Sequence, residues 1–146
     1  MTDINSNSVE ITLPGLPRGK GRPRFSSRGG RVRTYTDEKT ASFEGALRMA
    51  GAVAMGDREP LACALAADVT AVFPIPDSWS KTKRDAALAG TVRPTGKPDV
   101  DNIAKAALDG LNGIAYRDDA QIVRATVTKR YGTNPETVIV IRDYTA

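Results

Sequence analysis

Hydrophobic and polar residues alternate along four stretches of the chain, and this spacing predicts β-strands. The stretches are residues 8–13, 65–76, 121–131 and 136–144. The second stretch is the most apolar of the four, and this is typical of a strand in the core of a sheet. Prolines mark its end. Together they predict one sheet built around a buried strand.

Helical spacing of apolar residues appears in other stretches. A first helix is expected from about residue 38 to residue 54, with Asp37 as its cap, and a short second one from Ser80 to about Ala89. The third, residues 101–111, has the clearest pattern. The residues expected to face the core are Phe43, Ala46, Leu47, Ala50 and Ala54 in the first helix, Ala86 and Leu88 in the second, and Ile103, Ala107, Leu111 and Ile114 in and after the third.

The predicted order of elements is β-α-β-α-α-β-β, and no segment repeats. This order favours an α+β fold: a single small domain over residues 1–146, with a mixed β-sheet and helices packed on a face. Between the first strand and the first helix, residues 14–36 are interrupted by Pro and Gly and are expected to form a long loop or a loose hairpin.

Composition excludes several classes of chemistry. The chain has no histidine, so a Ser-His-Asp system, a histidine base and a histidine-bearing zinc site are impossible. Cys63 is the single cysteine, which leaves no internal disulfide and no CxxC site. The stretch "GTVRPTGKP" only partly resembles a phosphate-binding P-loop, so no nucleotide cofactor is expected. Without a secretory signal or a membrane span, a cytoplasmic location is expected.

Positive charge is concentrated in one segment. From Ile11 to Thr36 there is no acid, while seven arginines and lysines occur there. Subtracting those seven from the net charge of +4 leaves −3 for the rest of the chain. The segment therefore predicts contact with an anionic partner such as the DNA backbone, the alternative being a solvated flexible loop. The residues expected to contact DNA are Lys20, Arg22, Arg24, Arg31 and Arg33 in this segment, and Lys97 outside it.

Two aspartates in "KPDVDNIAKAALDGLN" mark the start of the third helix. In the extended entry after Pro98, Asp99 and Asp101 point the same way. The simpler interpretation is that an aspartate caps the helix, but one cap needs one carboxylate and the second only adds repulsion. Mg²⁺ would relieve that repulsion and use oxygen ligands. The pair therefore predicts a magnesium site on the solvent-facing side of the helix.

A second pair of acids occurs in "YRDDAQIV". A turn before a strand can bring a carboxylate to the end of the sheet beside the start of a neighbouring helix, so Asp118 or Asp119 could supply a third ligand; otherwise they only form a turn. Lys105, one helical turn after Asp101, could neutralise charge on a phosphate or could pair with Asp101 or Asp109. Acids, lysine and basic segment together suit phosphodiester hydrolysis.

These stretches, "KPDVDNIAKAALDGLNG" and "YRDDAQIV", together with "PRGKGRPRF", "RVRTYT" and "PIPDSWSKTKR", resemble the RusA family of Holliday junction resolvases. The resemblance runs from about Val9 to Tyr131. It implies a small α+β homodimer that binds four-way DNA junctions and makes paired, symmetric nicks with Mg²⁺, for which Mn²⁺ can substitute. The residues that match the family's site are the metal-binding and catalytic acids Asp99, Asp101 and Asp119, the catalytic Lys105, and the supporting Asn102 and Asp118.

Two classes of function remain open at this stage. The first is a metal-dependent, structure-selective endonuclease that acts in DNA recombination and repair, with action on flaps or forks as a variant. The second is a non-catalytic protein that binds or shapes DNA junctions, in which the acids would only cap a helix and form turns. The complete set of acids with Lys105 favours the nuclease.

Overall fold

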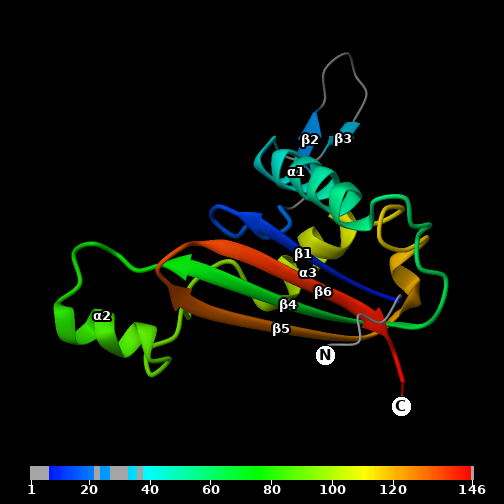
Figure 1. Cartoon of the computed structure of the whole chain (residues 1–146). Coiled ribbons are helices and arrows are strands. Elements are labelled where there is room, and N and C mark those ends of the chain that lie inside the picture. Colours follow the sequence, from blue (N-terminus) through cyan, green and yellow to red (C-terminus); the bar gives the residue numbers. More distant parts are fainter. Residues whose placement is uncertain (1–6, 22–23, 27–32, 36–37, 146) are drawn as a thin grey trace.

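The computed structural model describes residues 7–21, 24–26, 33–35 and 38–145, with the backbone alone for 24–26 and 33–35. Its elements are shown in Figure 1. They are β1 (Ser8–Pro14), β2 (Arg24–Ser26), β3 (Arg33–Tyr35), α1 (Glu38–Met55), β4 (Leu65–Pro74), α2 (Lys81–Leu88), α3 (Val100–Gly110), the 3₁₀ helix η2 (Asp119–Gln121), β5 (Ile122–Gly132) and β6 (Glu136–Asp143). The expected strands and helices are all present, most with boundaries within one or two residues.

Four strands form one mixed sheet in the order β1-β6-β4-β5. β6 is antiparallel to both of its neighbours, and β4 pairs with β5 in parallel. Parallel neighbours cannot be joined by a tight turn, so the chain must cross back over the sheet between them. α2 and α3 lie on this connection, and α3 runs back toward the beginning of β5 (Figure 1).

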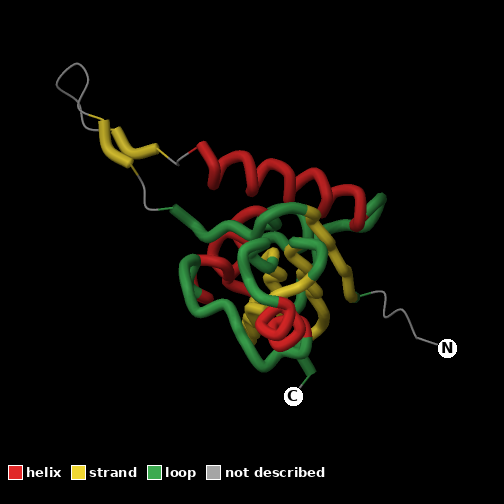
Figure 2. The backbone as a smooth tube through the Cα atoms, turned by 90° about the vertical axis from the view of Figure 1, so that its left-hand side faces the viewer, coloured by secondary structure: helices red, strands yellow, loops and turns green. Residues whose placement is uncertain are grey.

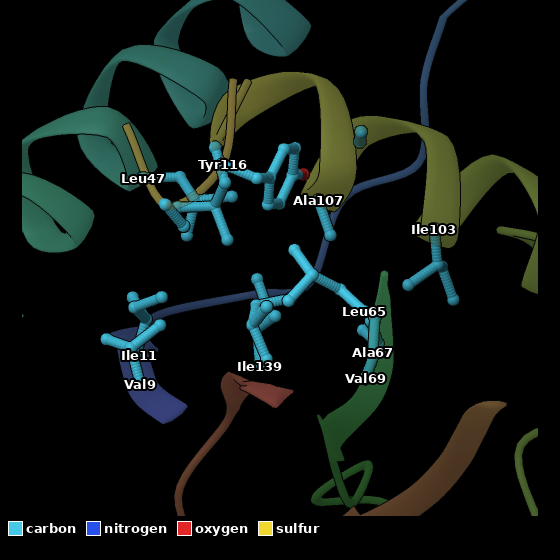
Figure 3. Packing of buried hydrophobic residues seen from close by; sticks show 14 of the residues in the cluster. Val9, Ile11, Leu47, Leu65, Ala67, Val69, Ile103, Ala107, Tyr116 and Ile139 are labelled. Carbon is cyan, nitrogen blue, oxygen red and sulfur yellow. The ribbon is translucent and has the colours of Figure 1, made fainter. Parts of the chain in front are cut away.

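α1 and α3 cover the same face of the sheet and enclose the core (Figures 1 and 3). Leu47 from α1, Ile103 from α3 and Ile139 from β6 are completely or almost completely buried between the layers. On β4, alternate residues point into this core, from Leu65 through Val69, as the alternation predicts. The expectation of an α+β domain with helices packed on a face of a mixed sheet is confirmed.

The short helix α2 packs differently from the prediction. Ser80 caps it as expected, because its hydroxyl accepts a hydrogen bond from the Lys83 backbone N–H at 3.3 Å. Ala87 is its buried residue, however, and Leu88 is 53% exposed. Helical periodicity gave the wrong face here, because a helix of two turns has too few apolar positions to define one. On α1, Ala46 is likewise exposed rather than buried.

Within the basic segment, β2 and β3 form an antiparallel pair, so the loose-hairpin alternative is the one found. The pair extends away from the body of the protein, beyond the beginning of α1 (Figure 2). The predicted cap Asp37 and the predicted DNA contacts Arg22 and Arg31 lie outside the described residues. Among the described residues, no helix combines the length and the apolar character that crossing a bilayer demands.

The helices α1 and α3 can approach closely at Gly110 because glycine has no side chain. A Cβ there would lie 2.9 Å from Leu47 Cδ2 and 3.3 Å from Leu47 Cβ, and Leu47 is fully enclosed. We expect Gly110→Ala to lower the free energy of unfolding by roughly 1 kcal/mol, since overpacking costs more than the gain in helix propensity. Chemical denaturation measures this change.

The matched control is Gly45→Ala in α1, where a Cβ meets no atom within 4 Å. That substitution should raise the free energy of unfolding by up to about 1 kcal/mol through helix propensity alone. If both variants were stabilised equally, the close approach of the two helices would not be limiting.

Candidate active site

The first pair of acids lies at the N-terminal end of α3. Asp99 is the N-cap residue in an extended conformation, and its carbonyl accepts the Ile103 backbone N–H at 3.0 Å. Its carboxylate makes no capping hydrogen bond. Asp99 and Asp101 are both exposed, and neither side chain has a hydrogen bond or ion pair within the described part of the chain. Asp99 is thus the N-cap residue that the simpler interpretation expects, but its carboxylate takes no part in the cap, and Asp101 lies in the first turn of the helix.

Lys105 follows one turn later on the same helix. It is exposed, and none of the ion pairs among the described residues includes it. The expected alternative, a salt bridge to Asp101 or Asp109, is therefore absent. Lys105 has no ion pair among the described residues and lies one turn after Asp101 on the same helix, which leaves its ammonium group available for a role at a phosphate. Its role in catalysis stays a prediction.

The root of the basic segment is fastened to this helix through Lys20. Its backbone N–H donates to the Asn102 carbonyl at 2.8 Å, and its ammonium group lies 2.5 Å from Glu44 Oε1 and 3.2 Å from Asp109 Oδ2. Partial burial lowers the pKa of Lys20, but the two carboxylates outweigh this effect and the net pKa is raised. Lys20 stays charged and is directed at protein carboxylates; a contact with DNA stays a prediction.

Two further contacts hold the same root in place. A Cβ at Gly19 would lie 2.7 Å from Pro98 Cβ, so only glycine allows the chain to approach the start of α3 this closely. The Gly21 backbone N–H donates to the Thr40 hydroxyl at 3.0 Å, which joins the segment to α1. The root of the basic segment, residues 19–21, is thereby anchored beside the start of α3.

The second pair of acids occupies the turn formed by η2. Asp118 caps it, because its carboxylate accepts the Ala120 backbone N–H at 3.0 Å. That bond, together with a hydrogen bond to Asp119, lowers the pKa of Asp118. Partial burial, the neighbouring Asp118 and the charge of Asp109 raise the pKa of Asp119. Since Asp118 has a structural task and Asp119 does not, Asp119 is the better candidate for a ligand.

Gln121 holds this turn in position, a role that reasoning from the sequence missed. Its side-chain oxygen accepts the backbone N–H groups of Arg117 and Asp118, both at 2.9 Å. Its amide nitrogen donates to the carbonyls of Leu61 and Cys63 at 2.8 and 3.0 Å. One side chain therefore ties the acidic turn to the segment that leads into β4. The signal in the sequence was the glutamine three residues after Asp118, which forms a capping box.

The two acid pairs lie at opposite ends of α3. The Asp119 backbone N–H donates to Asn112 Oδ1 at 3.2 Å, just beyond the helix's C-terminal end. From Asp101 to Gly110 the helix rises roughly 14 Å at 1.5 Å per residue. Among the described residues, no three acids or cysteines are close enough to hold one metal ion. Within a single copy of the protein, the turn does not lie beside the start of this helix, so that expectation is wrong.

The connection between β4 and β5 explains this separation. Because the two strands are parallel, a helix that returns the chain from the end of β4 must finish near the beginning of β5. The turn directly before β5 therefore meets the end of α3, whereas Asp99 and Asp101 lie at the start of α3, toward the opposite end of the strands. Fold topology, which the sequence pattern did not reveal, decides this geometry.

The remaining predicted DNA contacts lie in two places, beside Asp99 and on the hairpin formed by β2 and β3. Lys97 is exposed, and together with Lys20 and Asp99 it lines a polar pocket of about 560 Å³. Arg24 and Arg33 lie on the paired strands β2 and β3. A contact of any of these residues with DNA stays a prediction.

Exposed carboxylates beside the root of a basic segment suit an enzyme that acts on nucleic acid. The chain belongs to the RusA endodeoxyribonuclease family, because the model of that family, described as Endodeoxyribonuclease RusA, matches residues 14–142. The resemblance seen in the sequence is confirmed. Members of this family act on branched DNA junctions, and membership supports nuclease activity for this chain.

A relative in Bacillus subtilis (strain 168) is similar over nearly its whole length. It bears the name uncharacterized protein YqaN and is 36% identical over 142 residues, which cover 94% of this chain and 98% of that protein. The similarity therefore covers nearly the whole of both chains.

Gln121 is open to a direct test. Gln121→Met keeps the length of the side chain but removes its four hydrogen bonds, most of which lie at exposed positions, so we expect the free energy of unfolding to fall by about 1 kcal/mol. Gln121→Glu keeps the acceptor for the two N–H groups and places a carboxylate against the carbonyls of Leu61 and Cys63. We expect it to be destabilised as well. Wild-type stability in both variants, measured by urea denaturation, would show that the turn is held by other contacts.

Proposed function

We propose that this chain is a Mg²⁺-dependent endodeoxyribonuclease that resolves four-way DNA junctions by paired, symmetric nicks, with Mn²⁺ as a substitute ion, and that it works as a homodimer. The observation that carries the proposal is the pair of free carboxylates, Asp99 and Asp101, beside the anchored root of a basic hairpin. Membership of a family of junction-acting endonucleases supports it.

The chemistry of the donors fits a hard cation. Mg²⁺ prefers oxygen ligands and is usually held by one or two carboxylates together with water and substrate phosphate oxygens. Asp99 and Asp101 supply two exposed carboxylates with no other partner in the described part of the chain. When bound there, the ion would supply Lewis acidity at the scissile phosphate and a more acidic attacking water.

The protein's own residues have separate tasks in this proposal. Asp99 and Asp101 hold the ion, and the free ammonium group of Lys105 neutralises charge that develops on the phosphate. Asn102 supports the site, since its carbonyl fixes the backbone of Lys20 at 2.8 Å. The basic hairpin and Lys97 bind the DNA backbone and keep the scissile phosphate near the acids. Lys20 keeps that hairpin attached to α3.

Asp119 enters the site from a second copy of the chain in this proposal. Within one chain it lies at the far end of α3 from Asp101, so it cannot join the same ion there. In a two-fold dimer, the start of α3 in one copy can meet the acidic turn of the other, and the same contact then occurs twice. Two equivalent sites would act on the two strands of a symmetric junction.

The first test is Asp101→Asn, which preserves shape and removes the charge. We expect nicking of a labelled four-way junction in Mg²⁺ to fall about 100-fold or more, because a catalytic ion contributes several kcal/mol to the transition state. Junction binding, measured by gel shift in EDTA, should be retained. The control is Asp85→Asn on α2, which should nick at the wild-type rate. Unchanged nicking by Asp101→Asn would refute the assignment.

The second test asks whether a site takes acids from two copies. Asp101→Asn and Asp119→Asn should each be inactive alone, but a co-expressed mixture contains dimers with one complete site. We expect this mixture to recover single nicks, and not paired nicks, on a labelled junction.

The control mixture combines Asp99→Asn with Asp101→Asn, whose changes lie at the same end of α3. It contains no complete site in any pairing and should stay inactive. If the Asp101→Asn and Asp119→Asn mixture stayed inactive as well, with mixed dimers present, Asp119 would not act across the dimer.

A further inference from the structure

A second pocket, of about 400 Å³, adjoins the first acid pair and has no task in the proposed chemistry. Its walls come from four parts of the chain: the root of the basic segment, the beginning of α1, the end of β4, and the loop before α3. Lys97 and Pro98 line both this pocket and the polar pocket that contains Asp99. The two pockets are therefore neighbours that share one wall.

The walls combine apolar surface with positive charge. Leu16, Pro17 and Phe73 contribute apolar surface. Arg18, Lys39 and Lys97 are the charged residues that line this pocket, and no described acid lines it. None of these three cations forms an ion pair with a described acid. Apolar walls with unpaired cations at their side fit a nucleotide, whose base is apolar on both faces and whose phosphate is an anion.

The wall that this pocket shares with the pocket containing Asp99 indicates which nucleotide of a bound DNA strand it would receive. A strand whose phosphate lies at Asp99 and Asp101 has its next residue within reach of the wall formed by Lys97 and Pro98. Bases at the branch point of a junction can leave the stack at a smaller cost than bases inside a duplex. A pocket at this place can therefore receive a base that the branch point has already freed.

We propose that the pocket formed by Leu16, Pro17, Phe73 and Pro98, with Arg18, Lys39 and Lys97 at its side, binds the base of one nucleotide next to the cleaved phosphate. This inference rests on the proposed function, since it uses the acids to place the strand. The pocket would hold the branch point in register with the acids and would select the position of the nick by the base that it accepts.

The test is a double-mutant cycle between protein and DNA. Four-way junctions are prepared with one base removed at each position around the branch point in turn, and their Kd values are measured in EDTA, so that cleavage is not needed. For the wild-type protein we expect one position at which removal of the base weakens binding about fivefold or more. At other positions the loss should be small.

Two pocket variants close the cycle. Leu16→Ala changes a half-exposed side chain, and Phe73→Leu keeps an apolar side chain but removes the aromatic ring. In both, the penalty for the missing base should fall to less than half of its wild-type value. The matched control is Leu88→Ala on α2, a leucine of similar exposure outside this pocket, which should keep the full penalty. Leu16→Ala carries the test if Phe73→Leu proves unstable.

The outcomes separate the pocket from the nuclease. A wild-type protein with no position-specific penalty, or a penalty unchanged in both pocket variants, would overturn the pocket even if the junction is nicked normally in Mg²⁺. A penalty that depends on the pocket would support it even if no nicking occurred, which would instead refute the proposed function.

Discussion

The parallel pairing of β4 with β5 is the constraint on which the geometry of the site depends. It forces the chain to cross from the end of one strand to the beginning of the next. The helix α3 forms the returning part of this crossover, and Ile103, Ala107 and Leu111 in and after it are buried. Those apolar residues fix the rotation of the helix, so its polar side must face solvent. The free carboxylates at its start and the acidic turn beyond its end both follow from this one crossing.

A second constraint is electrostatic. Acids gather along α3 and in the turn after it, where partial burial, the neighbouring Asp118 and the charge of Asp109 together raise the pKa of Asp119. Lys20 offsets part of this charge by bridging Glu44 and Asp109, and in doing so it fastens the basic segment to two helices. One half-buried lysine thus joins the part of the chain that suits DNA binding to the helix that carries the acids.

Much of this structure could be predicted from sequence because local periodicity decides it. The buried face of α3 and the core side of β4 were correct, since long elements with many apolar positions leave one solution. The prediction for Leu88 was wrong and Ala86 is only half-buried, because a two-turn helix leaves several solutions. The partner of Gln121 could not be foreseen, because Leu61 lies 60 residues away and contact between them depends on which strands are neighbours. The distance between the two acid pairs could not be foreseen either, because it depends on the same arrangement of strands.

In the homodimer proposed above, separation of the acids would make cleavage depend on assembly. A chain that held its full set of ligands in one place could cut whatever DNA its basic hairpin touched. If the set is instead divided between the two ends of α3, a single copy offers only Asp99 and Asp101, and Asp119 reaches them when a second copy is correctly placed. Assembly then becomes a condition for cleavage, and two-fold symmetry produces the two sites together. In this scheme the fold that keeps the acids apart is also what prevents an isolated subunit from damaging DNA.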